Sequence, residues 1–192
     1  MQIEILAAQP EHATFAQAIC DLMAESAKAR GTGIATRKPD YVAEKIASGK
    51  AVLALIDGEL GGFSYIETWS HGRYVANSGL IVNPKFRRLG LARKIKAAIF
   101  NLSREKYPDA KIFGITTSLP VMKINSDLGY KPVTFSELTQ DDAFWAGCQS
   151  CPNYDILLRN QRIMCLCTAM LAPSANEQKR MAIDLSDRII QK

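Results

Sequence analysis

The residues with the most specific chemistry lie between Gly79 and Asn101, where the sequence reads GLIVNPKFRRLGLARKIKAAIFN. An apolar run ends at Asn83-Pro84, and because proline has no N–H to give to a sheet ladder, this pair marks the end of a strand. From Leu91 onward, apolar residues recur at the spacing of one helical face. The pattern predicts a strand, a turn and a helix. The polar residues expected on the opposite face of this helix are Arg93, Lys94, Lys96 and Asn101.

The turn between that strand and that helix has the composition of an anion-binding site. The first N–H groups of a helix have no partner within the helix and lie at the positive end of its dipole. Gly90 and Ala92 have almost no side chain, so the backbone can approach a bulky phosphate closely. Arg87, Arg88 and Arg93 add positive charge around it. A diphosphate fits this turn, and a strand-to-helix turn with solvated arginines is the alternative.

The pattern Arg87-x-x-Gly90-x-Ala92, preceded by Val82-x-Pro84, resembles the acetyl-CoA signature of the GCN5-related N-acetyltransferase (GNAT) family. A second similar feature, Leu128-Gly129-Tyr130, follows further along the chain, and the resemblance in element order runs from Ile3 to Leu138. It implies an α/β (α+β) fold with a mixed, mostly antiparallel twisted sheet flanked by helices. It also implies acetyl-CoA as cosubstrate and the transfer of an acetyl group to an amine.

The resemblance places the thioester where the strand ending at Val82 separates from the strand predicted over 112–116. Backbone N–H groups near Ile81 and Val82 would then polarise the thioester carbonyl. The residues that the resemblance implies for acetyl-CoA binding are Leu80, Ile81, Val82, Arg87, Arg88, Leu89, Gly90, Leu91, Ala92, Arg93 and Asn125.

Acetyl transfer to an amine needs a neutral amine, donors for the developing oxyanion and a proton for the departing thiolate. The tyrosine that many GNAT relatives use as the acid lies four residues before the helix-ending glycine, which is Asn125 here. An amide can donate a hydrogen bond but does not titrate. The position of the relatives' basic glutamate falls near Ser78. We therefore expect Asn125 in place of the acid, and a base such as Glu67 or His71, acting directly or through water; a structural role is the alternative for each.

A basic loop joins the first two predicted helices, in the place where the GNAT fold covers the acceptor pocket. It contains Arg30, Arg37 and Lys38. Guanidinium groups match carboxylates, so a small-molecule amine that also carries a carboxylate, such as an acidic amino acid, is the predicted acceptor; a solvated loop is the alternative.

Two further functions stay open. One is an amino-acid N-acyltransferase of arginine biosynthesis, similar to an N-acetyl- or N-succinylglutamate synthase, with the acyl group undetermined. The other is a non-catalytic regulator that binds acyl-CoA, because Asn125 and Ser78 stand where an acid and a base are expected.

Four cysteines near the C-terminus have the spacing C-x2-C, thirteen residues, then C-x-C. Two sulfur pairs brought together by a hairpin over 148–170 would form a structural zinc site. The alternative is four reduced thiols that pack as small hydrophobic groups, as we expect for Cys20. The proposed zinc ligands are Cys148, Cys151, Cys165 and Cys167.

The composition is that of a globular protein: 192 residues, 47% hydrophobic and 22% charged. We expect one domain over 1–172 and a C-terminal helix over 173–192, opened by a capping box at Ser174-x-x-Glu177, whose narrow apolar stripe would also allow a homodimer. Between Glu67 and Glu105 there are eight cations and no acids, which suits the coenzyme's phosphates better than a nucleic acid. No membrane-spanning run is expected, and a cytoplasmic location is predicted.

Periodicity and turn residues predict the remaining elements. The expected helices cover 11–29, 39–47, 91 to about 106, 119–128 and a segment after Ser174. The expected strands cover 3–7, 51–56, 61–69, 74–82, 111–116, 131–135, 154–158 and 163–170.

Overall fold

The computed structural model describes residues 1–30 and 36–190. The strands are β1 (Ile3–Ala7), β2 (Ala51–Ile56), β3 (Glu59–Trp69), β4 (Tyr74–Val82), β5 (Lys111–Thr116), β6 (Lys131–Val133) and β7 (Thr168–Ala172). The helices are α1 (Ala16–Arg30), α2 (Pro39–Ala47), α3 (Leu91–Lys106), α4 (Leu119–Asp127), α5 (Asp142–Ala146), α6 (Tyr154–Arg159) and α7 (Ala175–Ile190).

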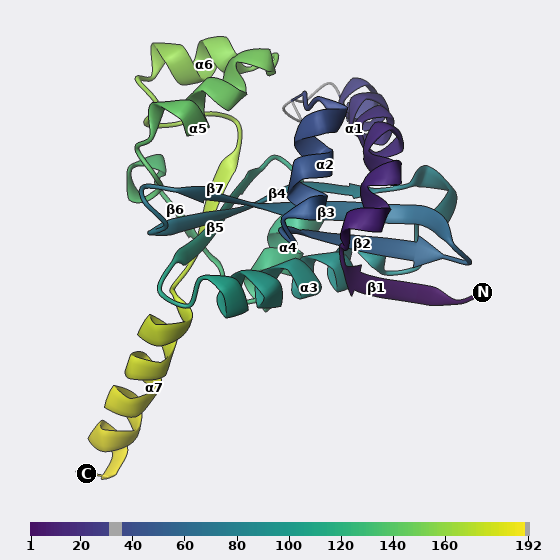
Figure 1. Cartoon of the computed structure of the whole chain (residues 1–192). Helices are drawn as coiled ribbons and strands as arrows, with labels where there is room; N and C mark the ends of the chain where they lie inside the picture. The colour runs from purple at the N-terminus through teal and green to yellow at the C-terminus, as the bar shows by residue number, and fades with distance from the viewer. Residues whose placement is uncertain (31–35, 191–192) are drawn as a thin grey trace.

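Within the described residues, the strands form one sheet in the order β1-β2-β3-β4-β5-β7-β6. Every neighbouring pair is antiparallel except β4 and β5, which are parallel. Helices α1 and α2 cover one face of the sheet, and α3 and α4 cover the other (Figure 1). The predicted α+β fold with a mixed, mostly antiparallel sheet is confirmed.

Alternation along β2 shows how one strand serves both layers. Successive side chains of a strand point to opposite faces of the sheet. Val52 and Ala54 belong to the core beneath α3, whereas Ala51 and Leu53 belong to the core beneath α1 and α2. The unbroken apolar run that the sequence shows at 51–56 is therefore a strand buried on both faces.

The parallel contact between β4 and β5 is short. The register runs from Tyr74 opposite Lys111 to Ala76 opposite Phe113, and among the described residues no pairing of these two strands continues beyond it. From Gly114 onward, β5 pairs only with β7 on its other side. The two strands therefore separate after three residue pairs, and the remaining part of β4 is free to face a ligand.

A bulge in β4 lies beside this opening. Phe63 faces Ile81 and Tyr65 faces Ser78, so one residue of β3 stands opposite Gly79 and Leu80 of β4. Gly79 has a positive φ of 64°, and a Cβ placed on it would lie 2.3 Å from the Tyr65 ring. Only glycine combines this backbone conformation with this close contact.

The region after residue 137 differs from the prediction. The expected strand over 154–158 is the helix α6, and the expected return strand over 163–170 is reduced to β7, so the predicted hairpin over 148–170 is wrong. In the Tyr154–Arg159 segment only Leu157 is buried, while Leu158 is exposed. One anchored apolar residue in such a short segment fits a helical turn as well as a strand, so packing decided the conformation.

The C-terminal helix α7 extends away from the rest of the molecule (Figure 1). Its predicted capping box is present: Ser174 N–H donates to Glu177, and Glu177 N–H donates to the Ser174 hydroxyl at 3.0 Å. No helix among the described residues has both the length and the apolar character needed to cross a bilayer.

We predict that Gly79→Ala lowers the free energy of unfolding by about 2–5 kcal/mol, because it adds left-handed backbone strain to a clash with Tyr65. Gly72→Ala is the matched control. Gly72 also has a positive φ, but an added Cβ there meets no atom within 4 Å, so about 1–2 kcal/mol is expected. Urea denaturation measures both; equal losses would show that the contact with Tyr65 does not constrain the bulge.

Candidate active site

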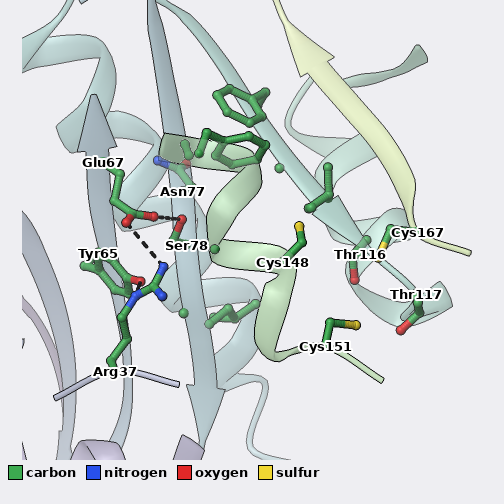
Figure 2. Close-up of a pocket in the computed structure, with 18 of the residues that line it drawn as sticks. Arg37, Tyr65, Glu67, Asn77, Ser78, Thr116, Thr117, Cys148, Cys151 and Cys167 are labelled. Carbon is green, nitrogen blue, oxygen red and sulfur yellow. Dashed lines mark hydrogen bonds and ion pairs between the residues drawn. The ribbon is translucent and has the colours of Figure 1, made fainter. Parts of the chain in front are cut away.

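A cavity of about 580 Å³ opens where β4 and β5 separate (Figure 2). Its walls come from β3, β4 and β5, from α3 and α4, from residues 36–41 at the start of α2, and from the segment that contains α5 and α6. The sheet therefore supplies the rigid part of the cavity, and the segment with α5 and α6 closes one side.

Glu67 on β3 is the centre of the polar network in this cavity. It is only 7% exposed. One carboxylate oxygen accepts a hydrogen bond from the Tyr41 hydroxyl at 2.5 Å. The same oxygen accepts from Arg37 at 3.3 Å, and the other oxygen accepts from the Ser78 hydroxyl at 2.6 Å (Figure 2). Three donors, one of them the cation Arg37, stabilise the buried carboxylate, as a buried charge requires.

Arg37 is fixed by a second contact as well. Its Nε donates to the Tyr65 hydroxyl at 2.7 Å. Burial raises the pKa of both Tyr65 and Tyr41, and the nearby Glu67 charge raises both further. Both phenols therefore keep their protons at neutral pH, and the network holds Arg37 in place at the cavity wall.

The predicted acceptor residues have different outcomes. Arg37 and Lys38 both line the cavity, as the loop hypothesis requires. The side chain of Arg30 and residues 31–35 lie outside the described part of the chain. Of the two predicted bases, Glu67 lies in the cavity wall, whereas His71 is exposed in the turn between β3 and β4 and does not line the cavity.

Asn125 of α4 reaches the same cavity and is 1% exposed. Its amide nitrogen lies 3.6 Å from the sulfur of Met170, while its carbonyl oxygen has no hydrogen-bond partner among the described residues. Asn77 of β4, in contrast, is fully engaged: it donates to Ser103 at 2.7 Å and accepts from the Tyr130 hydroxyl at 2.9 Å. Asn125 thus lines the cavity, and its role there stays a prediction.

Lys96 is a cavity residue that sequence reasoning missed. We expected it on the polar face of α3, but it is 2% exposed and lines the cavity beneath the separated strands. The signal was present in the sequence, because Lys96 lies one helical turn after Ala92 and one turn before Ile99, within the apolar stripe. We had placed Lys96 on the polar face of the helix only because its side chain carries a charge.

The predicted coenzyme turn forms a second groove at the N-terminus of α3. Gly90 is the residue before the helix, with a left-handed φ of 72°. Val82, Arg87, Arg88, Gly90, Leu91, Ala92 and Arg93 line the groove together with Pro120, Lys123 and Ile124 near the start of α4. Lys123 was not anticipated, because its contribution depends on the packing of α4 beside α3.

The other residues predicted for the coenzyme lie elsewhere. Leu80 and Asn125 line the larger cavity, Ile81 is buried in the core beneath α1, and Leu89 packs against the core beneath α3. The groove and the larger cavity both border α3 and α4, so one extended ligand could occupy both.

The four C-terminal cysteines all line the cavity, and all are reduced. Figure 2 shows Cys148, Cys151 and Cys167 on one side of it. Burial raises the pKa of Cys148 to about 11 and that of Cys167 to about 12, so these two are neutral thiols. Among the described residues, no group of His, Cys, Asp or Glu side chains is arranged to hold a metal ion. The predicted zinc site of Cys148, Cys151, Cys165 and Cys167 therefore has no support from the structure.

No protein-family model matches the sequence, and no curated protein sequence matches it significantly. The structure, however, resembles solved acetyltransferases. N-acetylglutamate synthase from Neisseria gonorrhoeae, in complex with coenzyme A and N-acetyl-glutamate, covers 91% of this chain at 16% identity, with a TM-score of 0.64. This chain spans only 35% of that synthase.

Two shorter proteins align along most of both chains. Rv2747 from Mycobacterium tuberculosis, in complex with CoA and NLQ, covers 88% of this chain and 98% of its own length at 13% identity, with a TM-score of 0.62. A GNAT superfamily phosphinothricin acetyltransferase from Sinorhizobium meliloti, in complex with AcCoA, covers 91% and 89% at 13% identity, with a TM-score of 0.60. This chain therefore has the fold of the GNAT acetyltransferases.

Proposed function

We propose that this protein is an acyl-CoA-dependent N-acetyltransferase whose acceptor is a small amine that also carries a carboxylate. The observation that carries the proposal is the charge of the cavity. Its described lining contains three basic side chains, Arg37, Lys38 and Lys96, and one carboxylate, Glu67. An anionic acceptor complements this excess, whereas a polyamine or a basic peptide would be repelled.

The donor binds through the groove at the N-terminus of α3. Unpaired N–H groups, the helix dipole and the arginines around Gly90 receive the diphosphate of coenzyme A. The pantetheine arm then follows the opening between β4 and β5, which brings the thioester into the larger cavity. Solved neighbours with this fold contain CoA or AcCoA, which supports this assignment.

The acceptor amine must lose a proton as it attacks the thioester. Ser78 lies on β4 at the cavity wall and donates its hydroxyl proton to Glu67 at 2.6 Å. In this proposal, Ser78 takes the proton from the amine while its own proton moves to Glu67. The carboxylate that acts as base is thus supplied by β3 and reaches the substrate through a serine of β4.

If the acceptor is glutamate, the same proposed activity would belong to arginine biosynthesis. One neighbour is an N-acetylglutamate synthase with N-acetyl-glutamate bound, and a glutamate acceptor would suit Arg37 and Lys38. The neighbour is much longer than this chain and only 16% identical, so the support comes from the cavity rather than from the likeness.

The first test is substrate range. Acidic, neutral and basic amines are supplied with acetyl-CoA or succinyl-CoA, and release of free thiol is measured. We expect turnover with acidic amino acids, and a kcat/KM at least about tenfold lower with the corresponding amides, because the amides lack the charge that the cations of the cavity attract. Turnover of basic amines alone would contradict the proposed acceptor. Binding of acetyl-CoA without thiol release from any amine would instead indicate a regulator.

The second test concerns the coenzyme groove. Ala92→Phe places a ring at the helix N-terminus without disturbing its backbone, and we expect it to weaken acetyl-CoA binding by about 100-fold or more, because the ring blocks the approach of the diphosphate. Asn101→Phe adds the same ring to an exposed position of α3 outside the groove and serves as control. Calorimetry measures both, and an unchanged affinity for Ala92→Phe would place the diphosphate elsewhere.

The third test concerns the proposed base. Glu67→Gln retains the shape of the side chain but cannot accept a proton, so we expect kcat to fall by about 10²-fold or more. Ser78→Ala should lower kcat in the same direction, because it interrupts the path to Glu67. Glu4→Gln, at an exposed position of β1, is the control. Thermal unfolding checks the fold of each variant; a kcat for Glu67→Gln within threefold of the wild type would exclude Glu67 as the base.

A further inference from the structure

Lys96 is the feature of the cavity that the proposed function has not yet used. The contact found for its amine among the described residues is with an aromatic ring: its Nζ lies 5.2 Å from the centre of the Tyr130 ring. A buried lysine usually pairs with a carboxylate or a carbonyl group. Here the amine is held by the aliphatic packing of α3 and by a ring face instead.

The position of Lys96 is fixed from several sides. The Tyr130 hydroxyl donates to Asn77, and Asn77 donates to Ser103, which lies about two turns after Lys96 on α3. This chain of contacts crosses the point where β4 and β5 separate. Lys96 therefore lies beneath the opening in which the thioester would be placed, in the same cavity wall as Asn125.

Burial also sets the chemistry of this amine. It lowers the pKa of Lys96 to about 7, and desolvation is its cause. The titratable group in contact with Nζ is Tyr130, whose pKa burial raises, so it is neutral at working pH. The carboxylate of Glu67 belongs to the same cavity but is paired with Arg37. Lys96 therefore exchanges a proton near neutral pH, as an acid catalyst must.

Expulsion of coenzyme A requires such an acid. The thiol of cysteine has an ordinary pKa of about 8.5, so a simple thiolate is more basic than this amine and takes its proton readily. Burial moves the pKa of Tyr41, Tyr65, Cys148 and Cys167 in the opposite direction, away from neutrality. Asn125 cannot release a proton in this range. Of these groups of the cavity wall, Lys96 is the one suited to donate.

We propose that Lys96 is the proton donor to the thiolate of coenzyme A during acyl transfer, an assignment that rests on the proposed function. The acceptor nitrogen forms a C–N bond with the thioester carbon, and the C–S bond breaks with its electron pair on sulfur. The ammonium group of Lys96 then gives its proton to sulfur and becomes a neutral amine. Coenzyme A leaves as the free thiol, and solvent protonates Lys96 again.

The experiment compares Lys96→Met, which removes the proton but keeps the length of the side chain, with Lys94→Met, the same change at an exposed position of α3. With the best acceptor from the substrate panel, we expect kcat of Lys96→Met to fall by about 10²-fold or more, with acetyl-CoA affinity within threefold of the wild type. In the wild type, the pH profile of kcat should include a limb on which kcat decreases as pH rises through the pKa of Lys96. Lys96→Met should lack this limb, and Lys94→Met should keep it.

Unfolding measured against pH checks the state of Lys96 without any activity. The folded pKa lies below the unfolded value of about 10.5, so between these values the unfolded chain binds the extra proton and Lys96 disfavours folding. This penalty decreases as pH rises from 7 towards 10. The stability gained by Lys96→Met relative to the wild type should therefore decrease over the same range, and a constant difference would show that Lys96 stays charged.

The outcomes separate the two proposals. Wild-type turnover together with a Lys96→Met variant that retains its kcat and its pH limb overturns the role of Lys96 and leaves the proposed function intact. Bound acetyl-CoA without turnover of any amine by the wild type overturns the proposed function, and the role of Lys96 falls with it. A lower kcat in Lys96→Met with an unchanged pH profile would mean that Lys96 only supports the packing, which also overturns its assignment as the acid.

Discussion

The short parallel contact between β4 and β5 is the constraint on which the rest of the site depends. Three residue pairs hold these strands together, and beyond them the backbone of β4 faces a cavity instead of a neighbouring strand. Unpaired backbone groups in a sheet carry a cost unless another partner satisfies them. An extended ligand that contains amide groups, such as the pantetheine arm of coenzyme A, can supply that partner. In the proposed function, the opening is thus both a gap in the sheet and a template for the donor.

The cavity is polarised by elements that approach it from different directions. Glu67 comes from the middle of β3, Arg37 from the loop before α2, and Ser78 from β4 next to the glycine bulge. The Gly79 backbone allows the Tyr65 ring to lie against it. In this position the Tyr65 hydroxyl accepts the hydrogen bond from Arg37. The bulge therefore affects the proposed acceptor side of the site as well as the shape of the sheet.

Helix α3 connects the two halves of the proposed chemistry. Its N-terminus lines the groove proposed for the diphosphate, and about one and a half turns further along it places Lys96 beneath the separated strands. A rigid helix keeps the distance between these two points fixed, since each residue advances the axis by about 1.5 Å. A donor anchored by its diphosphate at one point therefore has its thioester end directed toward the other. Gly62 supports this arrangement, because a Cβ on it would lie 2.6 Å from Ile95 of α3.

The sequence alone determined the features that follow from local rules. Pro84 ended a strand and Gly90 preceded a helix, since the missing N–H of proline and the left-handed backbone of glycine act within a few residues. These rules were enough to predict the strand and the turn. The resemblance to the GNAT family added most of the residues that line the groove, and it pointed to Glu67, Arg37 and Asn125 as residues to examine, although not to the contacts among them.

Only the tertiary structure decided the rest, because those features depend on contacts between distant residues. The pair Arg37–Glu67 spans 30 positions of the chain, and Tyr130 reaches Asn77 across 53. Lys96 is buried because the sheet and α4 close over a helix face that its charge had suggested was solvated. The C-terminal segment folded as short helices because one buried residue, Leu157, anchors α6, and no local pattern distinguishes that from a strand.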